Sequence, residues 1–181
     1  MKKLAALLLL CVTANCTAHD WEFDDLGVYY SRTHEDLPSF MKRLGRVVQD
    51  YTDATGHEVC GMLSQKSDQF AIRLSSDGVQ LGCSLDKQET VEGFEHTGVY
   101  VHSHPSGKND GGQRILRVSE RDRAWVKWRG ERPQWHRILY ITPGFSPDDI
   151  RFGNGWLIER GRVYSHTKGR RTEHGPIAAT Y

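Results

Sequence analysis

Residues 98–105 read Gly-Val-Tyr-Val-His-Ser-His-Pro, and this segment carries the most informative pattern in the chain. The aliphatic and aromatic run at 99–101 favours a β-strand. Because side chains in a strand alternate between its two faces, His102 and His104 are expected to point to the same side. Two imidazoles on one side of a strand end, closed by Pro105, form a candidate pair of nitrogen ligands for a metal ion.

The composition is that of an ordinary globular protein. The chain has 181 residues, a length that suits one domain with a sizeable core. Hydrophobic residues make up 38% and charged residues 26%, and the formal net charge is only +1. A nearly neutral chain without a basic cluster lacks the electrostatic footprint of a nucleic-acid-binding protein.

The first 18 residues resemble a secretory signal. Lys2 and Lys3 precede an apolar run over 4–14, which is too short to span a bilayer, and small residues stand before His19. We expect residues 1–18 to be removed, leaving a mature domain at 19–181 that is exported to the periplasm or secreted. Attachment of a lipid at Cys16 stays an alternative. No other stretch is long and apolar enough to cross a membrane.

Two of the four cysteines, Cys60 and Cys83, remain after removal of such a signal. An even pair in an oxidising compartment predicts a disulfide, and two buried free thiols are the alternative.

Hydrophobic periodicity and turn residues predict an α+β domain in which helices cover a central mixed sheet. An amphipathic helix is expected from Leu37 to Tyr51, with Pro38 in its first turn and Gly56 ending it. The predicted strands cover 57–63, 70–74, 79–83, 98–104 and 135–142, and a hairpin is predicted around residues 155–165. Residues 108–113 have a loop composition, and a second helix is predicted over 119–129.

Residues before and after the histidines in the sequence can supply the other groups that a catalytic metal site needs. A catalytic zinc requires three protein ligands and an open position, and His102, His104 and Asp122 can supply them. Glu58, in a predicted strand, is a candidate general base that takes a proton from water and passes it to the leaving amine. Ser119, at the start of the second helix, is a candidate donor to the oxyanion.

This combination resembles the signature of the JAMM (MPN+) metallopeptidases: a Glu, then His-Ser/Thr-His-Pro, then Ser-x-x-Asp. Glu58, the segment His102–Pro105 and the segment Ser119–Asp122 match it, and the likeness spans roughly Leu37 to Thr142. The resemblance implies a zinc-dependent peptidase or isopeptidase of the JAMM/MPN fold. It also implies zinc ligation by His102, His104 and Asp122, with Glu58 as base and Ser119 as oxyanion stabiliser.

One departure concerns the third ligand. The connection from Ser106 to Val118 is longer than the family's usual one, and a second Ser-x-x-Asp stands at Ser146–Asp149. We favour Asp122, because Ser146–Asp149 follows the predicted strand 135–142, whereas the motif should precede that strand.

The resemblance leaves the substrate open. An exported enzyme of this class would cleave an amide or isopeptide bond, in a peptide, a peptidoglycan cross-bridge or a protein conjugate. A catalytically silent binding module is the alternative from another class, since the fold has metal-free members. The sequence does not indicate an oligomeric state.

Overall fold

The computed structural model describes residues 21–106, 108–110, 113–131, 138–141 and 143–179. The predicted signal at 1–18, with Cys11 and Cys16, lies outside these residues. In the described part of the chain, no helix is long and apolar enough to cross a membrane.

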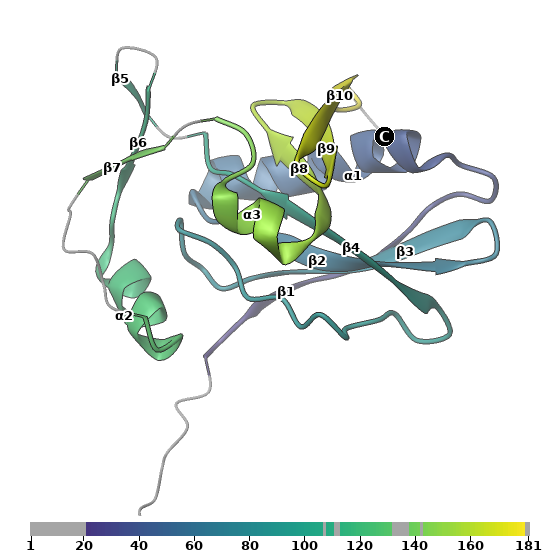
Figure 1. Cartoon of the computed structure of the whole chain (residues 1–181), viewed down its shortest axis with the longest axis horizontal. Helices are drawn as coiled ribbons and strands as arrows, with labels where there is room; N and C mark the ends of the chain where they lie inside the picture. Colours follow the sequence, from purple (N-terminus) through teal and green to yellow (C-terminus); the bar gives the residue numbers. More distant parts are fainter. Residues whose placement is uncertain (1–20, 107, 111–112, 132–137, 142, 180–181) are drawn as a thin grey trace, which may run out of the picture.

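The described chain is α+β, as predicted, and its principal sheet is mixed (Figure 1). Seven strands lie in the order β1-β3-β2-β4-β8-β9-β10. β4 and β8 are parallel, and every other neighbouring pair in this sheet is antiparallel. The strands are β1 (Asp24–Tyr30), β2 (Cys60–Lys66), β3 (Gln69–Ser76), β4 (Glu95–Ser103), β8 (Asn154–Glu159), β9 (Arg162–Thr167) and β10 (Arg170–Pro176).

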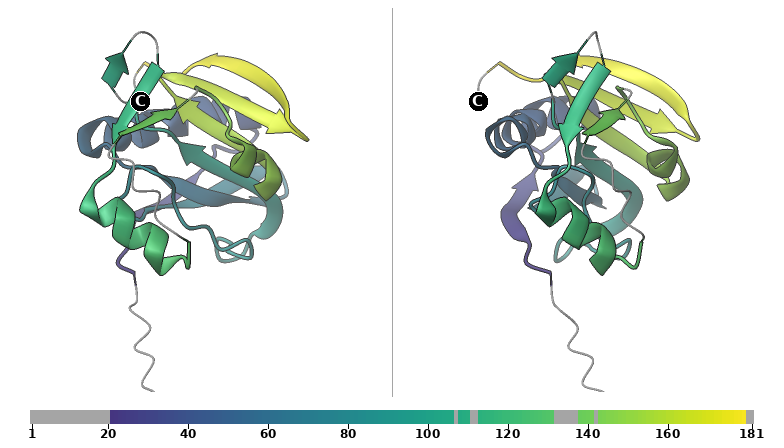
Figure 2. Two further views of the ribbon diagram at one scale, coloured as in Figure 1. Left: turned by 60° about the vertical axis from the view of Figure 1, so that its left-hand side comes forward. Right: turned by 90° about the vertical axis from the view of Figure 1, so that its left-hand side faces the viewer.

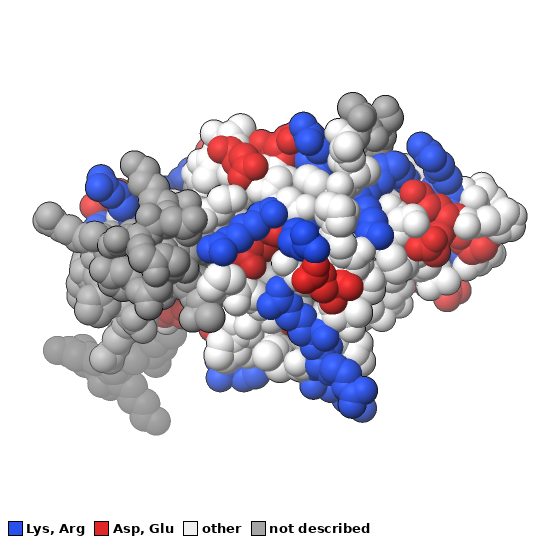
Figure 3. Space-filling view, turned by 90° about the horizontal axis from the view of Figure 1, so that it is seen from above, with Lys and Arg blue, Asp and Glu red and all other residues white. Residues whose placement is uncertain are grey.

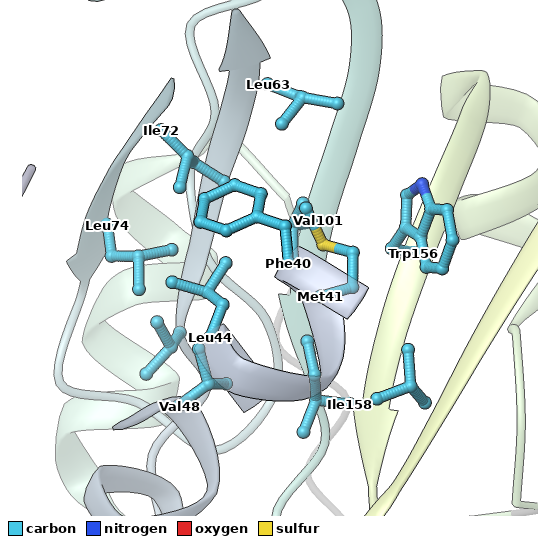
Figure 4. Packing of buried hydrophobic residues seen from close by; sticks show 12 residues of the cluster. Phe40, Met41, Leu44, Val48, Leu63, Ile72, Leu74, Val101, Trp156 and Ile158 are labelled. Atoms are coloured by element: carbon cyan, nitrogen blue, oxygen red, sulfur yellow. The ribbon is translucent and has the colours of Figure 1, made fainter. Parts of the chain in front are cut away.

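Helix α1 (Leu37–Thr55) covers one face of this sheet. Asp36 caps its N-terminus by accepting a hydrogen bond from the Ser39 amide, and Gly56 ends it in the left-handed conformation, with φ of 75°. Its apolar stripe packs on inward side chains of the strands to form the core (Figure 4). The helix contributes Phe40, Met41, Leu44 and Val48 to this core, and the strands contribute Leu63, Ile72, Leu74, Val101, Trp156, Ile158 and Val163.

The alternation of β4 decides which side chains leave this core. Val101 belongs to the cluster under α1, and the Ser103 hydroxyl lies 2.7 Å from the Thr52 hydroxyl of that helix. Tyr100 and His102 therefore point to the opposite face of the sheet. The predicted strand at the histidines is confirmed. It directs the His102 side chain to the face of the sheet that is opposite α1.

A 39-residue excursion, 105–143, separates β4 from α3 (Pro147–Phe152). It holds a small antiparallel sheet of β5 (Lys108–Asp110), β6 (Gln113–Arg117) and β7 (Ile138–Ile141), together with α2 (Glu120–Trp128). Figure 1 shows β5, β6, β7 and α2 beside the principal sheet, and Figure 2 shows α1 and α2 on different sides of it. Residues 108–110 and 113, which were expected in a loop, thus belong to the antiparallel strands β5 and β6.

Asp77 anchors α2 to the main body. Its buried carboxylate accepts hydrogen bonds from the Trp125 indole and, at 2.9 Å, from the Ser84 amide. Its backbone carbonyl accepts two more from the Arg121 guanidinium. The segment at 79–83 was expected to be a strand, but it is irregular chain. Its residues 81–83 line the neighbouring cavity, and Gly82 lies against Trp125 of α2.

The structure pairs Cys60 with Cys83, as predicted. Cys60 is the register partner of His102 across β2 and β4, so the disulfide ties the irregular segment to the strand next to the histidines.

Charge is mixed on the surface. Basic and acidic side chains lie next to one another on the face in Figure 3. Opposite charges are also paired in the ion pairs of Arg162 with Glu173, on the β9–β10 hairpin, and of Arg73 with Asp25, between β3 and β1.

Candidate metal centre

His102 and His104 converge at the end of β4. Their Nε2 atoms lie 3.2 Å apart, and both side chains are buried. The His104 amide donates to the Ile158 carbonyl at 3.3 Å, which holds the chain beside β8 for one residue after the strand has ended. The prediction that both imidazoles face one side is confirmed.

The acidic residue beside them is Asp149, on the first turn of α3. Its Oδ1 lies 3.4 Å from His102 Nε2, and its Oδ2 lies 3.8 Å from His104 Nε2. These three side chains form a group whose ligand atoms all lie within 4.8 Å of one another. Burial opposes ionisation of Asp149, but its interaction with His102 outweighs this, so the pKa of the carboxyl is well below its usual range.

Asp122 is not part of this group, and the expectation that it is the third ligand needs correction. Its Oδ2 accepts hydrogen bonds from the Ser119 amide at 2.7 Å and the Ser119 hydroxyl at 2.6 Å. Its Oδ1 accepts one from the Gln80 amide at 2.7 Å. A fully buried carboxylate with these donors closes a capping box and joins α2 to the irregular segment.

Ser119 is likewise occupied, because its hydroxyl proton goes to Asp122. Ser146 has the same capping position on α3, where its Oγ accepts from the Asp149 amide at 3.1 Å. In the described part of the chain the Ser146 hydroxyl donates to no protein group, and Ser146 lines the cavity at the histidines. Ser146 is therefore better placed than Ser119 to donate a hydrogen bond to a bound molecule.

Glu58 lines the same cavity as both histidines, as the sequence led us to expect. It stands just before β2 and is buried, with 7% of its surface exposed. Its backbone is held on both sides, since its amide donates to the Val79 carbonyl and its carbonyl accepts from the Ser76 hydroxyl.

The cavity has a volume of about 600 Å³ and combines polar groups with apolar walls. Leu81, Leu85, Trp125 and Phe152 supply apolar surface. Trp125 is held against Gly82, where an added Cβ would come within 2.8 Å of the indole ring. A hollow that combines apolar walls with convergent polar and charged groups can accommodate a small molecule or a peptide segment.

Tyr100 and His166 support the backbone of α3 at Asp149. The Tyr100 hydroxyl donates to the Asp149 carbonyl at 2.9 Å and lies 3.0 Å from His166 Nε2. Since the tyrosine proton goes to the carbonyl, His166 donates in this pair. Burial raises the pKa of Tyr100 far above its usual value and lowers that of His166, so both stay neutral at neutral pH.

Sequence reasoning did not assign three residues to this site: Asp149 and Ser146, whose segment was weighed and rejected, and Glu159, whose carboxylate lies behind His104. The second Ser-x-x-Asp was a visible signal for the first two. For Glu159, the only signal was an acidic residue closing an otherwise apolar strand, Trp156–Glu159.

Comparison of the chain with protein-family models, curated proteins and solved structures found no match.

Proposed function

We propose that this chain is a zinc-dependent metallopeptidase of the JAMM type, with His102, His104 and Asp149 as the metal ligands. The geometry of these three groups carries the proposal. In a tetrahedral zinc site with bonds near 2.0–2.1 Å, ligand atoms lie roughly 3.4 Å apart. The separations of 3.2 Å between the two imidazoles and 3.4 Å from His102 to Asp149 fit this spacing, and the third, from His104 to the other Asp149 oxygen, is 3.8 Å.

The donor chemistry fits as well. Two imidazole nitrogens and one carboxylate are a common ligand set of catalytic zinc, which leaves a fourth position for water or substrate. A zinc ion bound there would supply a Lewis acid and lower the pKa of coordinated water to about 7.

Side chains in the cavity carry out the proton transfer and stabilise the negative charge that develops on the substrate. Glu58 takes a proton from the attacking water and delivers it to the nitrogen of the leaving amine. The Ser146 hydroxyl donates a hydrogen bond to the carbonyl oxygen as negative charge develops on it. The apolar walls at Trp125 and Phe152 exclude bulk water and strengthen both interactions.

The substrate is an amide or isopeptide. Because the N-terminal sequence suggests export, a peptidoglycan cross-bridge is the preferred substrate, and a peptide or protein conjugate is the other class to test. The Cys60–Cys83 disulfide is consistent with an oxidising compartment.

The experiment measures zinc content and then hydrolysis of muropeptides and of isopeptide-linked peptides. We expect about one zinc per chain and turnover that Glu58→Gln abolishes while zinc stays bound, because an amide cannot accept the proton. Glu95→Gln is the matched control, since Glu95 lies exposed at the far end of β4. Absence of zinc after zinc-replete refolding would favour a silent binding module, and turnover by Glu58→Gln within a few-fold of wild type would exclude Glu58 as the base.

A further inference from the structure

Glu159, the last residue of β8, is the most deeply buried carboxylate beside the metal-binding group, with only 2% of its surface exposed. A buried carboxylate is costly unless donors face it, so its neighbours indicate its role. Its Oε1 lies 3.5 Å from His104 Nδ1, and its Oε2 accepts a hydrogen bond of 2.9 Å from the Gly144 amide.

His104 therefore stands between two different environments. Its Nε2 faces His102 and Asp149, and its Nδ1 faces Glu159. A neutral imidazole has one N–H and one lone pair, and an ionised carboxylate can only accept. Glu159 thus favours the proton on Nδ1, which leaves the lone pair of Nε2 directed at the metal position. The separation of 3.5 Å slightly exceeds a formed hydrogen bond, but it places the carboxylate directly beside the Nδ1 position.

The second oxygen of Glu159 acts on the other ligand-bearing segment. Gly144 lies two residues before Ser146, which begins α3 and so places Asp149. One carboxylate thereby contacts a ligand histidine and the chain that delivers the ligand aspartate.

His102 has no such partner. Its Nδ1 is buried and makes no hydrogen bond within the described residues. The His104 Nδ1 atom also makes no formed hydrogen bond there, but it faces the Glu159 carboxylate at 3.5 Å, so His102 is an internal reference for any effect of Glu159.

We propose that Glu159 is a positioning residue that holds His104 in the Nδ1–H tautomer and thereby sets the zinc affinity of the site. The inference rests on the proposed metal function, but its first test needs neither metal nor substrate. Carboxylates behind ligand histidines commonly contribute about 10- to 100-fold to metal affinity.

The tautomer is read by long-range ¹H–¹⁵N NMR of the histidine side chains in the metal-free full chain. We expect His104 of the wild type to carry its proton on Nδ1. In Glu159→Gln, the side-chain amide can accept from either His104 or Gly144, but its NH₂ group opposes the other donor. We expect a mixed His104 tautomer in this variant, an unchanged His102, and zinc affinity about 10- to 100-fold weaker by chelator competition.

Glu159→Leu removes both contacts and should show the larger effect, while the nearly isosteric Gln variant keeps the test valid if Leu fails to fold. Glu95→Gln is the control for zinc affinity. A wild-type His104 protonated on Nε2 would overturn the inference, as would weaker zinc binding in Glu159→Gln with an unchanged His104 tautomer. If the wild type binds no zinc at all, the proposed function fails, whereas the tautomer result bears on Glu159 alone.

Discussion

Asp122 and Asp149 occupy the same local position, three residues after a serine that caps a helix. In both capping boxes the aspartate carboxylate accepts from the serine amide, and the serine oxygen accepts from the aspartate amide. They differ in what the remaining carboxylate oxygen meets. In Asp122 it meets the Gln80 amide, and in Asp149 it meets His102.

This difference predicts opposite effects of two alanine variants. Asp149→Ala should weaken zinc binding by more than about 100-fold, because even the loss of a group behind a ligand can cost that much. Asp122→Ala should keep zinc but lower the free energy of unfolding by about 2 kcal/mol, through the lost cap and the unsatisfied Gln80 amide. Zinc content after equal dialysis and urea unfolding measure the two effects. Zinc loss in Asp122→Ala alone would contradict the assignment.

A substitution at Gly155 tests whether Tyr100 holds Asp149 in position. A Cβ at this position would lie 2.3 Å from the Tyr100 ring, which is buried and cannot move aside freely. Gly155→Ala should therefore displace the tyrosine hydroxyl from the Asp149 carbonyl, lower stability by about 1–3 kcal/mol and weaken zinc binding.

Gly61→Ala is the matched control for this variant. Its Cβ would collide with the Arg73 carbonyl on β3, so it should lower stability without changing zinc affinity. Equal zinc affinities of Gly155→Ala and wild type would show that Tyr100 does not position Asp149.

At the level of elements, local signals predicted most of the fold. The caps of α1, the capping box of α2, the histidine strand and the β8–β9 hairpin all follow from neighbouring residues, and each lies close to its predicted bounds. Residues 79–83 were mistaken for a strand, because apolar residues facing Trp125 and a cavity look the same in sequence as those facing a sheet.

Local signals did not decide which of the two aspartates lies beside the histidines. Both Ser-x-x-Asp segments form the same capping box, and only the pairing of β4 with β8 decides which helix reaches the histidines. That pairing is parallel and requires a crossover, and α3 lies directly before β8. Long-range strand order is a tertiary property, so the long connection after Pro105 could question the assignment of Asp122 but could not identify the alternative.

The Cys60–Cys83 disulfide gives a prediction for the cavity wall. Replacing both cysteines with serine should lower the free energy of unfolding by about 3 kcal/mol, given a sequence separation of 23 residues. Amide exchange should also quicken in the segment around Gly82, which the bridge ties to β2. Denaturant unfolding and hydrogen exchange measure these effects. Identical unfolding midpoints for the oxidised wild type and the double variant would count against a stabilising bridge.

At the scale of the whole molecule, the 39-residue excursion leaves and rejoins the main body at one place. His104, just before it, and Gly144, just after it, both contact the carboxylate of Glu159. The excursion nevertheless contributes Trp125 and Arg129 to the cavity.

Replacing residues 107–141 with a short Gly-Ser linker should therefore leave the seven-stranded sheet folded and able to bind zinc. Stability should fall, since Asp77 loses the Trp125 indole and the Arg121 guanidinium. Turnover should fall more than zinc affinity, because one wall of the cavity is gone. Circular dichroism, zinc titration and hydrolysis assays test this in one variant. Loss of the folded sheet would show that the excursion belongs to the core.

Because Glu159 contacts the chain on both sides of the excursion, this junction is also a suitable place to insert another domain. Loop-closure entropy grows only slowly with length, so a chain pinned at both ends tolerates inserts of very different size. A fluorescent reporter domain spliced between Ser106 and Pro143 would have its two termini beside His104 and α3. If zinc binding shifts His104 relative to α3, the emission should change with zinc, and the three proposed ligand residues would stay unaltered.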